Sequence, residues 1–174
     1  MNWSNPVSVS GYSLRYASAT STTAFANSNA VALPNATINP GRYYLVQLSG
    51  SPSPMTPTPD AFPTTNLAGT TSATGQVNMS ASTTGGGKLA LFNTATTDAT
   101  PSNQANAAYV DYVGYGTANY SETSPSPALT TTGDVELRAA GGCTDTGNNN
   151  ADVRPSRSEE HTSELQSPYV ISYA

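Results

Sequence analysis

Charged side chains are scarce in this chain of 174 residues, because Asp, Glu, Lys and Arg together make up only 10% of it. An ordinary soluble domain has about 25%. The six basic residues are scattered along the sequence, and the net charge is −5. Since binding to phosphate groups needs clustered Lys and Arg, we expect no nucleic-acid partner for this chain.

Long apolar runs and cysteines are equally rare. No apolar stretch approaches the roughly 20 residues of a membrane-crossing helix, so no membrane span is expected. Residues 1–6 lack the basic and apolar regions of a signal peptide, and we expect any export signal to lie outside this chain. Cys143 is the single cysteine, which excludes a disulfide framework and favours an inert thiol over a reactive nucleophile.

Apolar and polar residues alternate at strand spacing instead of helical spacing. Alternation and short apolar runs predict strands at residues 7–9, 12–16, 30–33, 42–48, 75–79, 88–92, 108–115 and 135–138. The strongest is 42–48, whose continuous apolar character suggests burial on both faces. We expect a turn at 38–41, a proline-rich surface loop at 49–65 and a glycine hairpin loop at 85–87. Short strands separated by turn residues predict an all-β fold, specifically a β-sandwich.

Residues 157–174 differ from the rest of the chain. They contain the single histidine, His161, together with Glu159, Glu160 and Glu164. Their sequence resembles the direct translation of a common sequencing adapter, so we interpret 157–174 as a disordered artefact tail and 1–156 as the domain. This interpretation discounts an acid–base or metal cluster formed by His161 with its neighbouring acids.

Catalytic residues are not evident once His161 is discounted. A Ser-His-Asp or Cys-His site needs a histidine, and none remains. Glycosidase-type chemistry needs two facing carboxylates. The acids outside the tail are dispersed without an evident pair: Asp60, Asp98, Asp111, Glu122, Asp134, Glu136, Asp145 and Asp152. We therefore expect that this chain is not an enzyme.

Residues 143–152 hold the densest group of oxygen-bearing side chains. Asp145, Asn148 and Asp152 are the candidate metal ligands there, and Ca²⁺ is the cation that suits them. The alternation of an EF-hand loop and its closing Glu are missing. Because Asx side chains also stabilise turns, a turn and a calcium site are both open interpretations, and no other cofactor is expected.

Five tyrosines recur at strand spacing and permit two interpretations: Tyr43, Tyr44, Tyr109, Tyr112 and Tyr115. They would form either a platform on which sugars stack or a set of core and cross-strand pairs. The strand spacing favours the core.

Four segments together resemble the bacterial branch of the lamin-tail domain family over about residues 5–153. They are residues 6–18 (PVSVSGYSLRYAS), 38–46 (INPGRYYLV), 110–119 (VDYVGYGTAN) and 142–152, which begins GCTDTGNN. The resemblance implies an immunoglobulin-like β-sandwich, an extracellular setting and no catalytic residues. It also implies a family strand upstream of Asn5, which is missing here or reduced to residues 1–3, and a partner cysteine for Cys143 near Tyr120, where this sequence has no cysteine. We therefore expect a fragment from a metagenomic gene.

The expected function is that of a non-catalytic binding, anchoring or structural module of a secreted bacterial protein. Its partner would be an unknown protein, a cell surface or a glycan, and the module would belong to a multidomain chain. Two alternatives stay open. One is a fragment of a larger extracellular nuclease- or phosphatase-type hydrolase whose catalytic domain is absent here. The other is a calcium- or carbohydrate-binding sandwich.

Overall fold

The chain is all-β, as predicted. The computed structural model describes residues 5–40, 42–48, 58–80, 82–94, 100–102, 107–131, 134–140 and 144–157. Of these residues, 35% lie in strands or bridges and 6% in helices. Predictions that fall on 49–57, Asp98, Cys143 or the tail after Arg157 lie outside the described residues.

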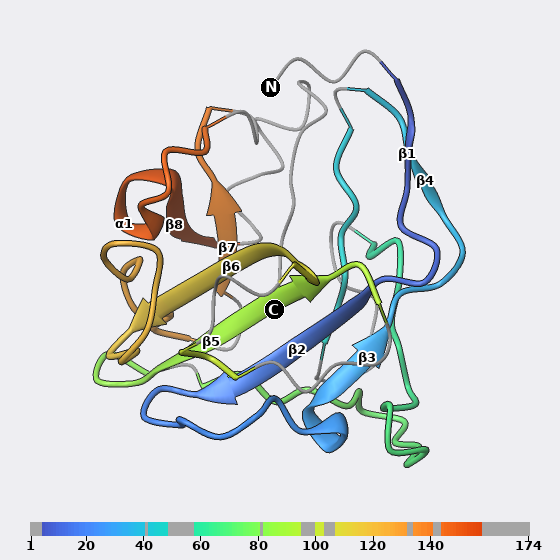
Figure 1. Cartoon of the computed structure of the whole chain (residues 1–174), viewed down its shortest axis with the longest axis horizontal. Helices are drawn as coiled ribbons and strands as arrows, with labels where there is room; N and C mark the ends of the chain where they lie inside the picture. Colours follow the sequence, from blue (N-terminus) through green and yellow to red (C-terminus); the bar gives the residue numbers. More distant parts are fainter. Residues whose placement is uncertain are drawn as a thin grey trace.

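A four-stranded antiparallel sheet with the order β3-β2-β5-β6 forms the centre of the molecule (Figure 1). Its strands in chain order are β2 (Ser13–Ser18), β3 (Ala30–Ala32), β5 (Gly86–Phe92) and β6 (Tyr109–Gly116). All four overlap with predicted strands, which the sequence marks either by alternation or by a short apolar run. The chain turns just before β2 at Gly11, which has a φ of 80°.

Two smaller antiparallel sheets flank the central one. β1 (Val7–Ser8) pairs with β4 (Thr37–Ile38), and β7 (Asp134–Arg138) pairs with β8 (Val153–Arg157). β7 was predicted, whereas β8 was not, because its sequence VRPSR contains a proline and no alternation. The backbone of Arg157, which we assigned to the tail, pairs with Asp134.

Within the described residues, the helical elements are a 3₁₀ turn, η1 (Asn27–Asn29), and one α-helical turn, α1 (Asn149–Asp152). Neither was predicted, since each is shorter than any periodic pattern. Asn148 caps α1, because its side chain accepts a hydrogen bond from the Asn150 amide.

The predicted strands at 42–48 and 75–79 are wrong. The first makes an isolated parallel bridge between Val46 and Ala61, and Leu48 O accepts bonds from the amides of Gln76 and Val77. The backbone is therefore satisfied by neighbouring loops instead of a strand ladder. The apolar pattern reported burial and not strand pairing, because Val46, Leu48 and Val77 are all buried.

The predicted hairpin loop at 85–87 is also wrong, since Gly86 and Gly87 are buried residues of β5. A Cβ on Gly87 would overlap the ring of Tyr16, and a Cβ on Gly86 would overlap the backbone of Thr117. Glycine is needed there because other chain atoms pass close by and not because the chain turns.

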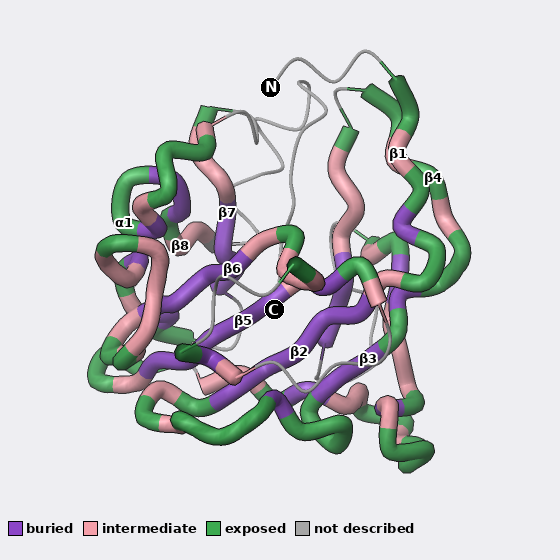
Figure 2. Tube along the Cα trace, in the orientation of Figure 1, coloured by how far each residue is buried: buried purple, intermediate pink, exposed green. Residues whose placement is uncertain are grey.

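The central sheet is buried on both faces over most of its length, and purple predominates along β2, β5 and the second half of β6 in Figure 2. One face packs against the segments around Val46, Leu48 and Val77 in the larger apolar cluster. The other face carries a smaller cluster that includes Phe25 and Phe92. At about 25 cal/mol per Å² of buried apolar surface, these two clusters are the main stabilising contribution of the fold.

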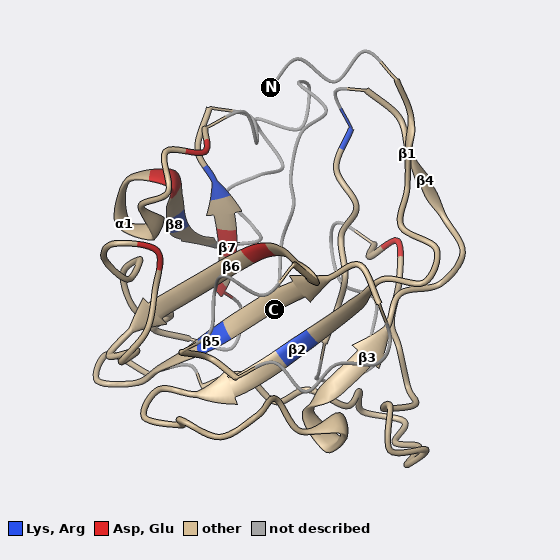
Figure 3. Ribbon diagram, viewed as in Figure 1, with Lys and Arg blue, Asp and Glu red and all other residues tan. Residues whose placement is uncertain are grey.

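Two cations lie on the face of the sheet that carries the smaller cluster, and Figure 3 shows both in blue on β2 and β5. Arg15 and Lys88 are fully buried. Arg15 Nη1 donates to Asn27 Oδ1 at 3.0 Å, and its guanidinium lies over the ring of Phe92. Lys88 Nζ donates to Ala19 O, Ser21 O and Asn119 Oδ1 at 2.9, 2.7 and 2.5 Å, which satisfies all three of its protons.

Candidate functional site

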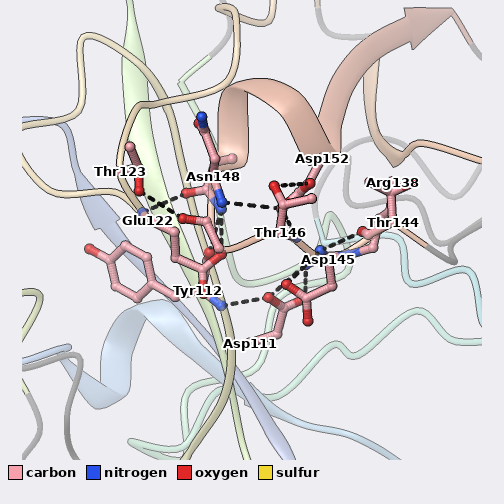
Figure 4. A network of polar contacts seen from close by, with 12 residues as sticks. Asp111, Tyr112, Glu122, Thr123, Arg138, Thr144, Asp145, Thr146, Asn148 and Asp152 are labelled. Atoms are coloured by element: carbon pink, nitrogen blue, oxygen red, sulfur yellow. Dashed lines mark hydrogen bonds and ion pairs between the residues drawn. The ribbon is translucent and has the colours of Figure 1, made fainter. Parts of the chain in front are cut away.

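A cluster of polar side chains lies where β6, the end of β7 and the loop before α1 meet (Figure 4). We call it the polar cluster. It consists of Asp111, Glu122, Arg138, Asp145, Thr146, Asn148, Asn149 and Asp152. All three candidate metal ligands predicted from the sequence belong to it.

Asp152 holds the loop before α1 in shape. Its carboxylate accepts bonds from Thr146 N and Thr146 Oγ1 at 2.8 Å each and from Asn148 N at 3.2 Å. Burial alone would raise the pKa of Asp152, but the hydrogen bonds from Thr146 and Asn148 outweigh it and hold the pKa below its ordinary value. The carboxylate is thus engaged by the backbone of its own loop.

The other two candidate ligands are also engaged within the chain. Asn148 Oδ1 accepts the Asn150 amide, and Asp145 Oδ1 lies 3.6 Å from Arg138 Nη1. Among the residues that the structure describes, no three His, Cys, Asp or Glu side chains gather as metal ligands would. The hydrogen bonds of this loop are those of the turn interpretation, in which Asx side chains bond nearby backbone.

Asn149 is the centre of the polar cluster and was missed by the sequence analysis. Its Oδ1 accepts the amides of Gly114 and Glu122, at 2.9 and 3.0 Å. Its Nδ2 donates to Tyr112 O and to Glu122 Oε2, at 2.9 and 2.8 Å. The side chain is fully buried, and all of its hydrogen-bonding capacity is used. Asn149 therefore joins α1 to the edge of β6 and to the segment around Glu122.

Arg138 links β7 to β6 at the other end of the polar cluster. Its Nη2 donates to both carboxylate oxygens of Asp111, at 2.7 and 2.6 Å, and its Nη1 donates to Thr144 O. The Arg138 side chain is 10% exposed and that of Asp111 is 29% exposed, so solvent screens the pair only in part.

Glu122 is the member of the polar cluster that titrates near neutral pH. Its pKa is raised to about 7, mainly by burial and in part by the negative charges of Asp111 and Asp145, against the lowering effects of Arg138 and of the hydrogen bond from Asn149. The sequence analysis expected no acids to converge, yet the fold brings these three into electrostatic interaction. No spacing in the sequence signals this, because each acid belongs to a different segment.

The backbone beside Glu122 is strained. Thr123 has a φ of 52°, and the Ser124 amide donates to Glu122 O across it at 2.6 Å. The Thr123 hydroxyl compensates by donating to Gly147 O in the loop before α1. A non-glycine residue in this left-handed region is held there by its surroundings.

Of the tyrosines that suggested a sugar platform, the three in β6 pack into the interior of the protein. Tyr112 and Tyr115 are 2% and 0% exposed. Tyr109 packs against Phe92 with ring centroids 4.3 Å apart. Tyr43 and Tyr44 are half-buried. The geometry of the three β6 tyrosines is that of core packing.

Comparison with known proteins gives no relative to guide the interpretation: no family model, curated protein or solved structure matches the chain. Within the described ranges, no helix has the length and apolarity needed to cross a membrane.

Proposed function

We propose that this chain is a non-catalytic accessory module of a secreted bacterial protein, with an immunoglobulin-like sandwich of the lamin-tail type. The module would bind, anchor or support its parent protein. The observation that carries the proposal is that the buried side chains of the polar cluster form their hydrogen bonds within the chain. Asn149 and Asp152 are its two fully buried members, and their side-chain polar atoms form hydrogen bonds with other groups of this chain.

The packing of the central sheet supports the sandwich part of the proposal. One face of the sheet, with Leu14 and Leu89, shares an apolar cluster with Val46, Leu48 and Val77, which come from segments outside the sheet. A sandwich needs a second layer that shares its core with the first in this way.

The absence of turnover is tested with the full chain and chromogenic phosphomonoester and phosphodiester substrates, with and without divalent cations. We expect no hydrolysis above background. Turnover that disappears in the Glu122→Gln variant would overturn the proposal, because a carboxyl whose pKa is raised to about 7 suits general acid–base chemistry at neutral pH.

The anchoring function is tested by co-sedimentation of the chain with washed bacterial cell envelopes. We expect saturable binding that unlabelled protein displaces. Calorimetry with Ca²⁺ and with a glycan panel distinguishes the remaining alternative. A cation titration with heat that is lost in Asp145→Asn would favour a calcium-binding sandwich over the proposed module.

A further inference from the structure

Glu136 is a carboxyl group buried between two sheets. It lies in β7 and is 2% exposed, as is its hydrogen-bond partner Ser126. The Ser126 hydroxyl lies 3.2 and 3.3 Å from the two carboxyl oxygens of Glu136. Glu136 forms no ion pair among the described residues. Its hydrogen bond with the Ser126 hydroxyl is therefore the contact that positions the carboxyl group.

Ser126 is bound to the edge of the central sheet through its backbone. Its amide donates to Gly114 O and its carbonyl accepts the amide of Gly116, both at 2.8 Å. Ser126 thereby extends the sheet beyond β6 as a single parallel bridge to Tyr115. The contact between Ser126 and Glu136 joins this edge to β7, and through β7 to β8.

The groups around Glu136 oppose a negative charge. Asp134 lies on the same face of β7, and Tyr115 of β6 interacts electrostatically with Glu136. Arg138, also on that face of β7, is bound to Asp111 at 2.6 Å. The pKa of Glu136 is raised to about 8, mainly by burial and in part by the charge of Asp134, although the hydrogen bond from Ser126 acts in the opposite direction.

We propose that Glu136 and Ser126 form a pH-sensitive latch that holds β7 against the edge of β6 while the carboxyl carries its proton. A protonated carboxyl both donates to and accepts from a hydroxyl, so it is satisfied without water. An ionised carboxylate only accepts, and its charge favours a state in which water reaches it. Ionisation therefore opens the contact, whereas Asn149 and Arg138 still tether the other end of the β7–α1–β8 segment.

The sign of the effect follows from the direction of the pKa change. Because the pKa of Glu136 is raised in the closed state, the latch is fully stable below the ordinary glutamate pKa of about 4.3 and weakens as pH rises toward 8. A raised value of about 8 implies that the open fraction grows by more than tenfold between pH 6 and pH 9.

Amide hydrogen exchange of the full chain, followed by NMR between pH 6 and pH 9 and corrected for intrinsic rates, tests the latch. We expect protection at the amides of Ser126 and Gly116 to fall at least tenfold. Amides in the centre of β2 and β5 should change less than twofold, because opening is local. Equal losses in β2 and β5 would mean global destabilisation and would overturn the proposal.

Three variants separate the latch from other causes. Glu136→Gln keeps a neutral, hydrogen-bonding side chain and should remove the pH dependence at Ser126. Ser126→Ala should give low protection across the whole range. Asp60→Asn, which changes a carboxyl bonded to the Leu45 amide, should retain the wild-type fall. An unchanged fall in Glu136→Gln, or no fall in the wild type, would exclude the latch.

Discussion

Hydrogen bonds between Thr146 and Asp152 close the loop before α1. Both the amide and the hydroxyl of Thr146 donate to the Asp152 carboxylate, each over 2.8 Å. Since bonds to a charged acceptor contribute more than neutral ones, this pair fixes the position of α1 more firmly than its four residues alone would.

Replacing Asp152 by Asn should lower the free energy of unfolding by about 2 kcal/mol, because the NH₂ group of Asn would face hydrogen-bond donors of Thr146 or Asn148. The measurement is urea denaturation at pH 7. Asp145→Asn is the matched control, since Asp145 is 72% exposed and its change should stay within about 0.5 kcal/mol.

The same pair gives an acid limit to stability. The pKa of Asp152 is lowered in the folded chain, so its contribution is present above the ordinary aspartate pKa of about 3.9 and is lost as pH falls below it. The deficit of Asp152→Asn should therefore shrink between pH 6 and pH 2. A constant deficit over that range would contradict the assignment.

Replacing Asn149 by Ala should destabilise the chain by about 3 kcal/mol, because four polar groups, two of them in buried hydrogen bonds, lose their partner at once. Thermal unfolding measures the loss. The neighbouring Asn150 is exposed, and Asn150→Ala should cost about 0.5 kcal/mol or less. Similar shifts in Tm for the two variants would refute the central role of Asn149.

Lys88 is the single lysine of the chain, which makes its burial directly measurable. An excess of an amine-reactive ester at pH 8 should label the native protein once, at the α-amine, and the urea-denatured protein twice. Burial lowers the pKa of Lys88 to about 8, so protonation alone would not protect it. Rapid double labelling of the native chain, detected by intact mass, would show that the amine is accessible.

Substitutions at Gly116 and Gly147 distinguish the cost of steric overlap from the cost of backbone strain. Both have positive φ, 59° and 71°, but a Cβ on Gly116 would overlap Gly85 O whereas a Cβ on Gly147 meets open space. Gly147→Ala should cost about 1 kcal/mol of left-handed strain, and Gly116→Ala substantially more. The comparison uses chemical denaturation, and equal losses would place the Gly85 backbone elsewhere.

Replacing Glu122 by Gln should stabilise the chain at alkaline pH. The pKa of Glu122 is raised to about 7, so the folded state is favoured below the ordinary value of about 4.3 and loses that advantage as pH rises to 7. Unfolding at pH 5 and pH 8 should show a gain of about 1 kcal/mol for the variant at the higher pH, after allowance for screening. A gain that is equal at both pH values would rule out titration as the cause.

The sequence predicted the four strands of the central sheet because each contains alternating residues or a short apolar run and each has a strand partner. Residues 42–48 show the limit of that reasoning. Their apolar run fits an interior segment, but Asp60 binds the Leu45 amide through its side chain and thereby replaces part of a strand ladder. Periodicity reports which residues are buried, whereas pairing depends on segments far away in the sequence.

The polar cluster was predicted only in part. The density of Asx residues pointed to the loop of Asp145, Asn148 and Asp152, and local backbone bonding explains it. Asn149 was not identified, because its four bonds reach β6 and the segment around Glu122, and no local pattern encodes such distant partners. The interaction of Glu122 with Asp111 and Asp145 depends in the same way on tertiary structure.

The sequence separation of β2 and β5, which pair antiparallel, should determine the order in which strands pair during folding. β3, β4 and the long segment after them separate these neighbours along the chain, whereas only α1 and one loop separate β7 from β8. Closing the longer loop costs more chain entropy before any contact rewards it. During synthesis on a ribosome, β2 can therefore pair with β3 early, but its other edge stays unpaired until β5 has emerged.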